Sequence, residues 1–475
     1  LCTFKGLECA GDIRFHDWHE RADGIRAPVV FTARSGATLS GHVWAARNGP
    51  ARRPGIVITT GSVQAPEELY WGQAATLAKH GYVVLTYDVQ GQGASDTLGE
   101  GPDLLEGVPA QQGQPFYDGT EDALDFLLSS SSSPYAPRPS CGTGTSHAPK
   151  QNRRVAAGLN AAYNPLGDLV DSDRIGIAGH SLGAAAVSFV GQRDPRVDAI
   201  VAWDNLSAPD EGIAGTPGCA SAPATRRAPP ITKPALGIAN DYGIIPTPFL
   251  RDPGPGQKSA AFRAYRDAEV DSGELVIRGG CHQESAFIPV GITGVYPLPC
   301  GSLRGGDLIA WYTTAWFDKY VKGDESADSR LLTDRWRDDA RGARVDLGGD
   351  RNLFSFYFRS PLDVALAGGG RAVCEDLRAG CTALAPDGGP PGYDFVADAH
   401  SAPIAEAPAL GGSTGSPAPP PAVPASEAKR SQKALKRALR KCKRKRGKQL
   451  KRCIRRVGRR FAAVQGPRAR GSIRG

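Results

Sequence analysis

One serine in the middle of the chain has the neighbours that a nucleophile needs. Residues 179–183 read Gly-His-Ser-Leu-Gly, a G-x-S-x-G pattern centred on Ser181. The largely apolar run 174–178 before it predicts a buried strand, and residues 184–190 after it predict a packed helix. A sharp turn between the two would lift the hydroxyl clear of the sheet, and the flanking glycines would prevent collisions there. The pattern therefore predicts nucleophilic chemistry at Ser181.

A serine hydroxyl needs a base, and the base needs a carboxylate that orients it. In a strand–turn–helix setting of this kind, the acid follows the nucleophile and the histidine comes last. Only two of the eight histidines, His282 and His400, follow Ser181. His400 lies in a Pro-, Ala- and Gly-rich stretch, so we predict that His282 is the base. Asp204 and Asp241 each follow a predicted strand and are both candidates for the acid; we favour Asp241.

Acyl transfer also needs two N–H groups that stabilise the oxyanion of the tetrahedral intermediate. We predict that these are the backbone N–H groups of Leu182, which follows the nucleophile, and of Ser62, with Val63 as the alternative to Ser62. Ser62 stands after the predicted strand 55–60, and Gly61 would let the backbone approach a substrate closely. This chemistry requires neither a metal nor an organic cofactor, and we predict none.

The elements that must position these residues predict an α/β fold. Apolar strand-like runs alternate with helical segments, which is typical of a mostly parallel sheet with helices on both faces. The predicted strands of this sheet span residues 55–60, 82–87, 174–178, 197–203, 234–239 and 274–277. Two further strands, 28–32 and 39–45, predict an N-terminal hairpin. Ligand chemistry in such sheets gathers at the carboxyl ends of the strands. The candidate residues all stand just past predicted strand ends: Ser62, Ser181, Asp241 and His282.

The chain resembles the α/β-hydrolase superfamily, in particular secreted bacterial dienelactone-hydrolase-like esterases and cutinase-like polyester-degrading enzymes. The resemblance covers about residues 28–325 and rests, in order, on the motifs VITTGS, VLTYDVQGQGASD, GHSLG, ALGIANDYGIIP and IRGGCHQESAF. It implies the α/β-hydrolase fold and an acyl-enzyme mechanism with Ser181, Asp241 and His282 as the triad. Dienelactone hydrolases proper use a cysteine nucleophile, and haloalkane dehalogenases and epoxide hydrolases use an aspartate, so the serine disfavours those activities. We therefore expect a serine esterase that acts on small or polymeric esters.

Two other functions stay open at this point. A peptidase or a thioesterase could use the same triad, because the three residues do not distinguish between these substrates. The hydrolase domain could also be inactive, in a protein whose role is to bind a polyanion or a cell surface. Binding of a probe that labels activated serines would separate the enzymes from the inactive protein.

The cysteines indicate an exported protein. There are ten of them, and several fall in close pairs: Cys2/Cys9, Cys374/Cys381 and Cys442/Cys453. Such pairs predict disulfides and therefore an oxidising compartment. The sequence contains no apolar run of the ~18 residues that a membrane span needs. The first residues do not form a signal peptide. We therefore expect a secreted or cell-surface protein, given as a processed or truncated chain from which the export signal is missing.

The net charge of +8 is unevenly distributed along the chain. Of the 57 lysines and arginines, 21 lie in residues 428–475, which contain no acidic residue. We predict that this tail is a helical hairpin closed by Cys442 and Cys453 and that it binds an anionic cell-surface polymer or a membrane surface; nucleic acid is disfavoured. The predicted organisation is an N-terminal extension (1–27), a catalytic domain (28–330), a small C-terminal extension (331–385), a Pro/Ala/Gly-rich linker (386–427) and the basic tail (428–475).

Overall fold

A computed structural model of the chain describes residues 24–62, 65–108, 113–204, 206–209, 228–243, 260–286, 303–339 and 349–386. The chain divides into two compact units, residues 1–407 and 408–475, and all described residues belong to the first. The predicted linker, the basic tail and the pairs Cys2/Cys9 and Cys442/Cys453 lie outside the described residues.

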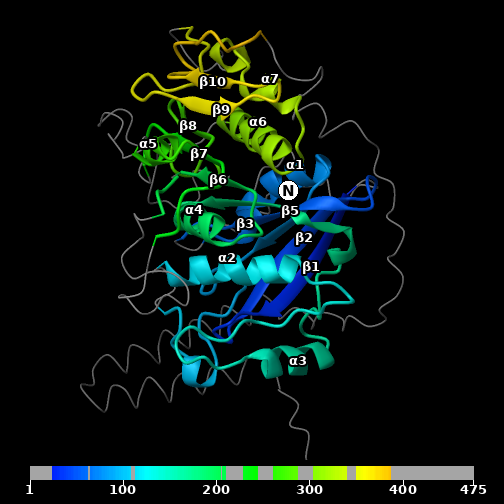
Figure 1. The fold of residues 1–475 in the computed structure, drawn as a ribbon. Helices are drawn as coiled ribbons and strands as arrows, with labels where there is room; N and C mark the ends of the chain where they lie inside the picture. The colour runs from blue at the N-terminus through cyan, green and yellow to red at the C-terminus, as the bar shows by residue number, and fades with distance from the viewer. Residues whose placement is uncertain are drawn as a thin grey trace, which may run out of the picture. The chain divides into compact units, whose positions relative to one another are not determined.

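A mixed sheet of ten strands forms the centre of the described part (Figure 1). Its strands lie in the order β1-β2-β4-β3-β5-β6-β7-β8-β9-β10. Their bounds are β1 (Gly24–Thr32), β2 (Thr38–Ala46), β3 (Arg53–Thr59), β4 (Val83–Tyr87), β5 (Val170–His180), β6 (Ala199–Trp203), β7 (Ala235–Asn240), β8 (Ser272–Ile277), β9 (Leu362–Ala365) and β10 (Arg371–Cys374). In this order, the neighbouring strands from β4 through β3 to β8 pair in parallel. The pairings at the two edges, which involve β1 and β2 on one side and β9 and β10 on the other, are antiparallel. The predicted α/β class is confirmed, and the sheet is parallel at its centre only.

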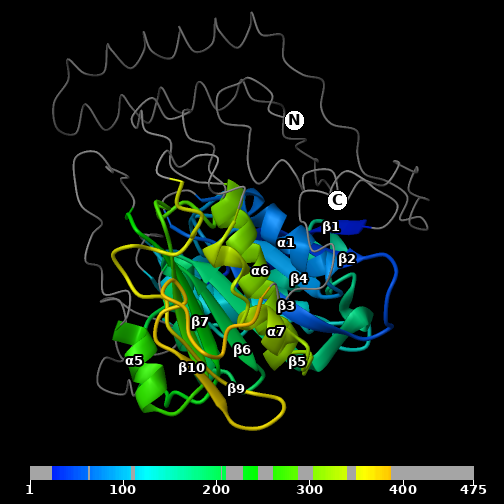
Figure 2. The same ribbon diagram turned by 90° about the horizontal axis from the view of Figure 1, so that it is seen from above.

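Helices cover the sheet on both faces (Figures 1 and 2). Along β6, Val201 and Trp203 belong to one hydrophobic core, and Ile200 and Ala202 belong to another, as the alternation of side chains in a strand requires. The first core also contains residues of α1 (Trp71–Lys79) and α6 (Leu303–Tyr320). The second contains residues of α2 (Gln114–Leu127), α4 (Leu182–Arg193) and α5 (Ala260–Asp267).

Burial on both faces explains why the central strands read as apolar runs. Every residue of β3, β4, β6, β7 and β8 is buried. A strand covered on both sides has no solvent-facing positions, so its sequence does not alternate. Two short helices, α3 (Ala148–Ala156) and α7 (Ala327–Leu331), complete the described helices, together with four short 3-10 turns. None of the described helices has the length and apolarity that crossing a bilayer requires.

A buried arginine connects the N-terminal hairpin to α2. β1 and β2 pair antiparallel up to Thr32 and Thr38, as the sequence predicts. Arg34, in the turn between them, is 1% exposed. Its guanidinium lies 2.8 Å from carboxylate oxygens of Glu121 and Asp122 and 3.4 Å from Asp118. A charged carboxylate in a buried site needs a partner of opposite charge, so these ion pairs connect the hairpin to α2.

The described residues beyond 330, 331–339 and 349–386, belong to the same compact unit as the strands before them. β9 pairs with β8 and β10 pairs with β9, so the segment predicted as a small extension, 331–385, contributes two strands to the sheet. Cys374, the last residue of β10, forms the predicted disulfide with Cys381. Cys141 and Cys281 are each disulfide-bonded as well.

Candidate active site

Ser181 stands in the turn between β5 and α4, where the sequence predicts it. Its φ is 56° and its ψ is −118°, a conformation that a residue with a side chain rarely adopts. Its N–H donates to the carbonyl of Trp203 at 3.0 Å, so the neighbouring strand holds the turn. A Cβ on Gly179 would collide with the carbonyl of Gly183, and a Cβ on Gly183 would collide with the end of β3. The close approach of these backbones therefore requires both glycines.

The imidazole of His282 is paired with Asp204. Its Nδ1 lies 2.5 Å from Oδ2 of Asp204, and the two side chains are 17% and 8% exposed. Asp204 follows directly after β6, and its predecessor Trp203 is the register partner of His180. Asp204 and Ser181 therefore stand next to each other at the ends of adjacent strands. Because Nδ1 faces a carboxylate, it carries the proton of the neutral ring, and Nε2 is the acceptor. This is the tautomer that a general base requires.

Backbone strain is concentrated at these two strand ends. Three described residues other than glycine have a positive φ: Ser181, Asp204 at 41° and Glu269. Two of the three thus follow β5 and β6 directly. The backbone N–H of Asp204 donates to the carbonyl of Ile238 in β7 at 2.8 Å, which stabilises the strained residue from the next strand. Such conformations persist where the surrounding structure imposes them, and they cluster at functional sites.

Asp241 does not pair with His282, its predicted partner, but with other groups. Its Oδ2 accepts the backbone N–H of Gly279 at 2.7 Å, and its Oδ1 accepts the hydroxyl of Ser355. These bonds connect the end of β7 to the turn after β8. The structure thus corrects the predicted acid partner of His282 to Asp204. The physical reason is the hydroxyl of Ser355, more than a hundred residues further along the chain, which nothing in the sequence around Asp241 indicates.

The two predicted oxyanion donors lie beside the serine. Leu182 is the first residue of α4, where a backbone N–H has no partner within the helix. Ser62 follows Gly61 in the loop after β3, and a Cβ on Gly61 would lie 3.3 Å from the Cβ of Ser181. Within the described residues, neither the Leu182 N–H nor the Ser62 N–H makes a hydrogen bond. Val63, the alternative to Ser62, lies outside the described residues.

A chain of hydrogen bonds passes behind the serine. The backbone N–H of Gly61 donates to Oη of Tyr70 at 2.9 Å, and Oη of Tyr70 lies 2.8 Å from Nδ1 of His180. Nε2 of His180 lies 2.7 Å from the backbone carbonyl oxygen of His282. The rings of His180 and His282 are 4.7 Å apart, centroid to centroid. The chain therefore connects the loop after β3, the serine turn and the loop of His282.

Burial determines the charge of both side chains in this network. Burial, together with the ring of His282, lowers the pKa of His180 to about 3. Burial also raises the pKa of Tyr70. Both groups are therefore neutral near pH 7. His180 lies within the G-x-S-x-G motif, but it precedes Ser181, and the base was sought only among the histidines that follow the nucleophile. No pattern in the sequence indicates Tyr70.

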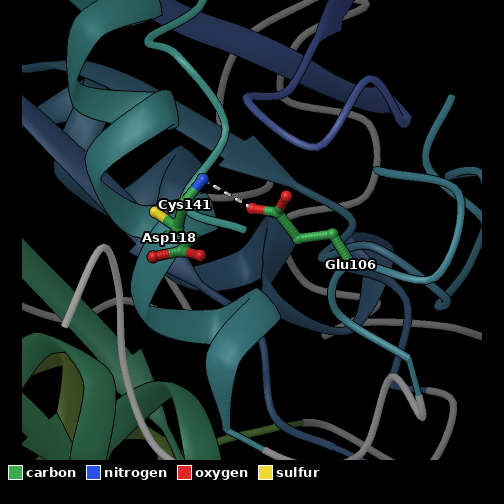
Figure 3. Close-up of side chains that lie close together, drawn as sticks. All are labelled: Glu106, Asp118 and Cys141. Atoms are coloured by element: carbon green, nitrogen blue, oxygen red, sulfur yellow. Dashed lines mark hydrogen bonds between the residues drawn. The ribbon is translucent and has the colours of Figure 1, made fainter. Parts of the chain in front are cut away.

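One group of potential metal ligands occurs among the described residues. The ligand atoms of Glu106, Asp118 and Cys141 lie within 4.8 Å of one another (Figure 3). Cys141 is disulfide-bonded, so its sulfur is no thiolate. Glu106 accepts the backbone N–H of Cys141 at 2.9 Å, and Asp118 faces the buried Arg34. The three residues thus have partners in the protein, and we assign no metal to them.

Comparisons with known proteins add no assignment. A scan against models of known protein families finds no match, and a search of curated proteins also finds none. The case for a function therefore depends on the residues and their geometry.

Proposed function

We propose that the chain is a serine hydrolase of the α/β-hydrolase fold that cleaves carboxylic esters through an acyl-enzyme intermediate. The observation that carries the proposal is the His282–Asp204 pair at the carboxyl ends of the central parallel strands, where Ser181 stands in a strained turn. The order of the three residues along the chain, and a nucleophile placed between a central strand and a helix, are features of this fold.

In the first half of the reaction, Oγ of Ser181 attacks the ester carbonyl carbon while Nε2 of His282 takes the hydroxyl proton. Asp204 keeps Nδ1 protonated and stabilises the imidazolium that forms. The N–H groups of Leu182 and Ser62 donate to the oxyanion of the tetrahedral intermediate. When this intermediate collapses, the bond to the alcohol breaks and His282 gives its proton to the leaving oxygen. The acyl group then remains on Ser181.

In the second half, water replaces the alcohol. His282 takes a proton from the water, and the hydroxide equivalent attacks the acyl carbonyl. The second tetrahedral intermediate is stabilised by the same two N–H groups. Its collapse releases the carboxylic acid and returns the proton from His282 to Oγ of Ser181. The protein is unchanged after one turnover, and no other reactant is needed.

The test is hydrolysis by the purified full chain of p-nitrophenyl esters of graded acyl length, beside a thioester and an anilide of the same acyl groups. We expect ester cleavage that the Ser181→Ala variant lacks, with a loss in kcat of ~10⁴-fold or more. Retention of a tenth of the wild-type kcat in Ser181→Ala would exclude Ser181 as the nucleophile. Faster cleavage of the anilide would indicate a peptidase, and faster cleavage of the thioester would indicate a thioesterase, in place of the proposed esterase.

We also propose that the protein is secreted or attached to the cell surface. Support comes from the disulfide between Cys374 and Cys381 and from the disulfide-bonded state of Cys141 and Cys281. Disulfides persist in oxidising compartments and are rare in the cytosol. The tail of residues 428–475, with its 21 basic residues, would attach the enzyme to an anionic polymer or membrane surface through an attraction that salt screens.

A further inference from the structure

We propose that Tyr70 and His180 are positioning residues that align the general base with the oxyanion loop. His180 binds the main chain of His282 on one side, and through Tyr70 it binds the main chain of Gly61, next to the oxyanion donor Ser62, on the other. The inference depends on the proposed function, because it assigns these two residues to the alignment of that same site.

The hydrogen-bonding capacities of the four groups permit one arrangement of protons. Nε2 of His180 faces a carbonyl oxygen, which only accepts, so Nε2 carries the proton. Nδ1 of the neutral ring is then an acceptor, and the hydroxyl of Tyr70 donates to it. The oxygen of Tyr70 accepts the N–H of Gly61. Every donor has an acceptor. Each group donates to the next one, from the N–H of Gly61 through Tyr70 and His180 to the carbonyl of His282.

A second proton on His180 would break this arrangement. With both ring nitrogens protonated, the Tyr70 oxygen would receive two N–H groups, and its own hydroxyl proton would lose its acceptor. Among the described residues, the titratable groups that face His180 are Tyr70 on the segment before α1, His282 on the loop after β8 and Asp204 after β6. Asp204 is engaged by His282, whose ring becomes cationic during turnover. A neutral His180 therefore keeps one geometry throughout the cycle, with no second positive charge beside the base.

The position of His180 in the chain makes the alignment direct. It is the last residue of β5 and directly precedes the strained Ser181, while its ring binds the loop of the base. The ring of Tyr70 is in turn stacked at 6.3 Å on Trp203, the residue before Asp204. Nucleophile, base, acid and oxyanion loop are thus fixed to one buried cluster. A misplacement of ~1 Å in such a site can cost ~10²-fold in rate.

The kinetic test uses three variants and a matched control. Tyr70→Phe removes the hydroxyl that binds Gly61 and His180. His180→Leu removes the bonds to Tyr70 and to the carbonyl of His282. His180→Gln restores an N–H donor near the position of Nε2. The control is Tyr82→Phe, which deletes an equally buried hydroxyl bound to Asp318 at 2.7 Å. Tyr82 precedes β4 and so lies at the end of the sheet opposite to the site.

We expect Tyr70→Phe and His180→Leu to lower kcat for a p-nitrophenyl ester by about 10- to 100-fold, with KM within about twofold of wild type. His180→Gln should recover a large part of the loss, and Tyr82→Phe should leave kcat unchanged. An active wild-type protein whose Tyr70→Phe and His180→Leu variants keep full kcat would overturn the positioning role alone. An inactive wild-type protein would instead contradict the proposed function.

A spectroscopic arm tests the arrangement on the unaltered full chain. With ¹⁵N-labelled histidine, and with the His180 signal identified by its loss in His180→Gln, we expect His180 to be the Nε2–H tautomer. We also expect its signals to stay constant from pH 8 to pH 5. A His180 that is protonated at Nδ1, or that titrates with an ordinary midpoint in this range, would overturn the proposal whatever the variants do.

Discussion

The Asp204→Asn substitution is the sharpest chemical test of the site, because it removes one charge at nearly constant shape. The carboxylate lies 2.5 Å from Nδ1 of His282 and is 8% exposed on its side chain, so water screens the bond little. An asparagine that turns its NH₂ group to Nδ1 forces the proton onto Nε2, and the ring then cannot accept the proton of Ser181. An asparagine that turns its oxygen to Nδ1 keeps the tautomer but no longer stabilises the imidazolium.

Either orientation removes transition-state stabilisation. Loss of the correct tautomer in a serine triad costs ~10⁴-fold in kcat, which corresponds to ~5.5 kcal/mol at ~1.4 kcal/mol for each factor of ten. We therefore expect kcat of Asp204→Asn to fall by about 10³- to 10⁴-fold. KM should change little, because the carboxylate acts on the base and not on the substrate.

Asp241→Asn is the matched control, since it makes the same change at the other candidate acid. Asp241 binds Gly279 and Ser355, so its loss should lower the free energy of unfolding by about 1–2 kcal/mol and leave kcat within tenfold of wild type. Both variants are assayed on one p-nitrophenyl ester at several pH values and unfolded with urea. A dead Asp241→Asn beside an active Asp204→Asn would refute the assignment.

Three further predictions concern His180, Arg34 and the basic tail. Because the folded protein holds the pKa of His180 at about 3, below its ordinary 6.5, the unfolded chain binds a proton that the folded chain does not as pH falls through this window. Acidification should therefore lower the free energy of unfolding by up to about 1.4 kcal/mol per pH unit. When this free energy is measured by urea unfolding at pH 7, 6 and 5, it should depend less steeply on pH in His180→Gln than in the wild type, and an equal pH dependence would contradict this. Arg34→Met leaves Asp118 and Asp122 without their buried cation and should cost about 3–5 kcal/mol in urea unfolding, whereas a loss below 1 kcal/mol would show that Arg34 is not their main partner. Truncation before Ala428 should leave kcat unchanged and abolish salt-sensitive retention on an anionic matrix, and unchanged retention would exclude the tail as the anchor.

The fold was predictable where local signals are strong. Strands buried on both faces read as apolar runs, and the glycines around Ser181 mark the turn, because both signals lie within a few residues of the feature they predict. The antiparallel strands β9 and β10 were harder to predict. They are only four residues long, and they join the sheet through pairing with β8, which lies about ninety residues earlier in the chain.

The sequence indicates the members of the candidate site but not which of them pair. Sequence order predicted Ser181 and His282 as nucleophile and base, and it left Asp204 and Asp241 as alternatives for the acid because both follow buried strands. The pairing depends on where the loop of His282 folds back. His180 binds the carbonyl of His282 in this loop, and Asp241, itself bound by Ser355, accepts the N–H of Gly279 before it. A contact of this kind has no local pattern, so only the folded chain distinguishes the two acids.

The central claim, that Ser181 is an activated nucleophile, is tested most directly by covalent labelling. A fluorophosphonate reacts with a serine only when a base and an oxyanion site activate it. We predict that the folded full chain gains one adduct, that peptide mass spectrometry assigns it to Ser181, and that Ser181→Ala and heat-unfolded protein gain none. A folded wild-type chain that stays unlabelled, or whose label lies on another residue, would contradict the account.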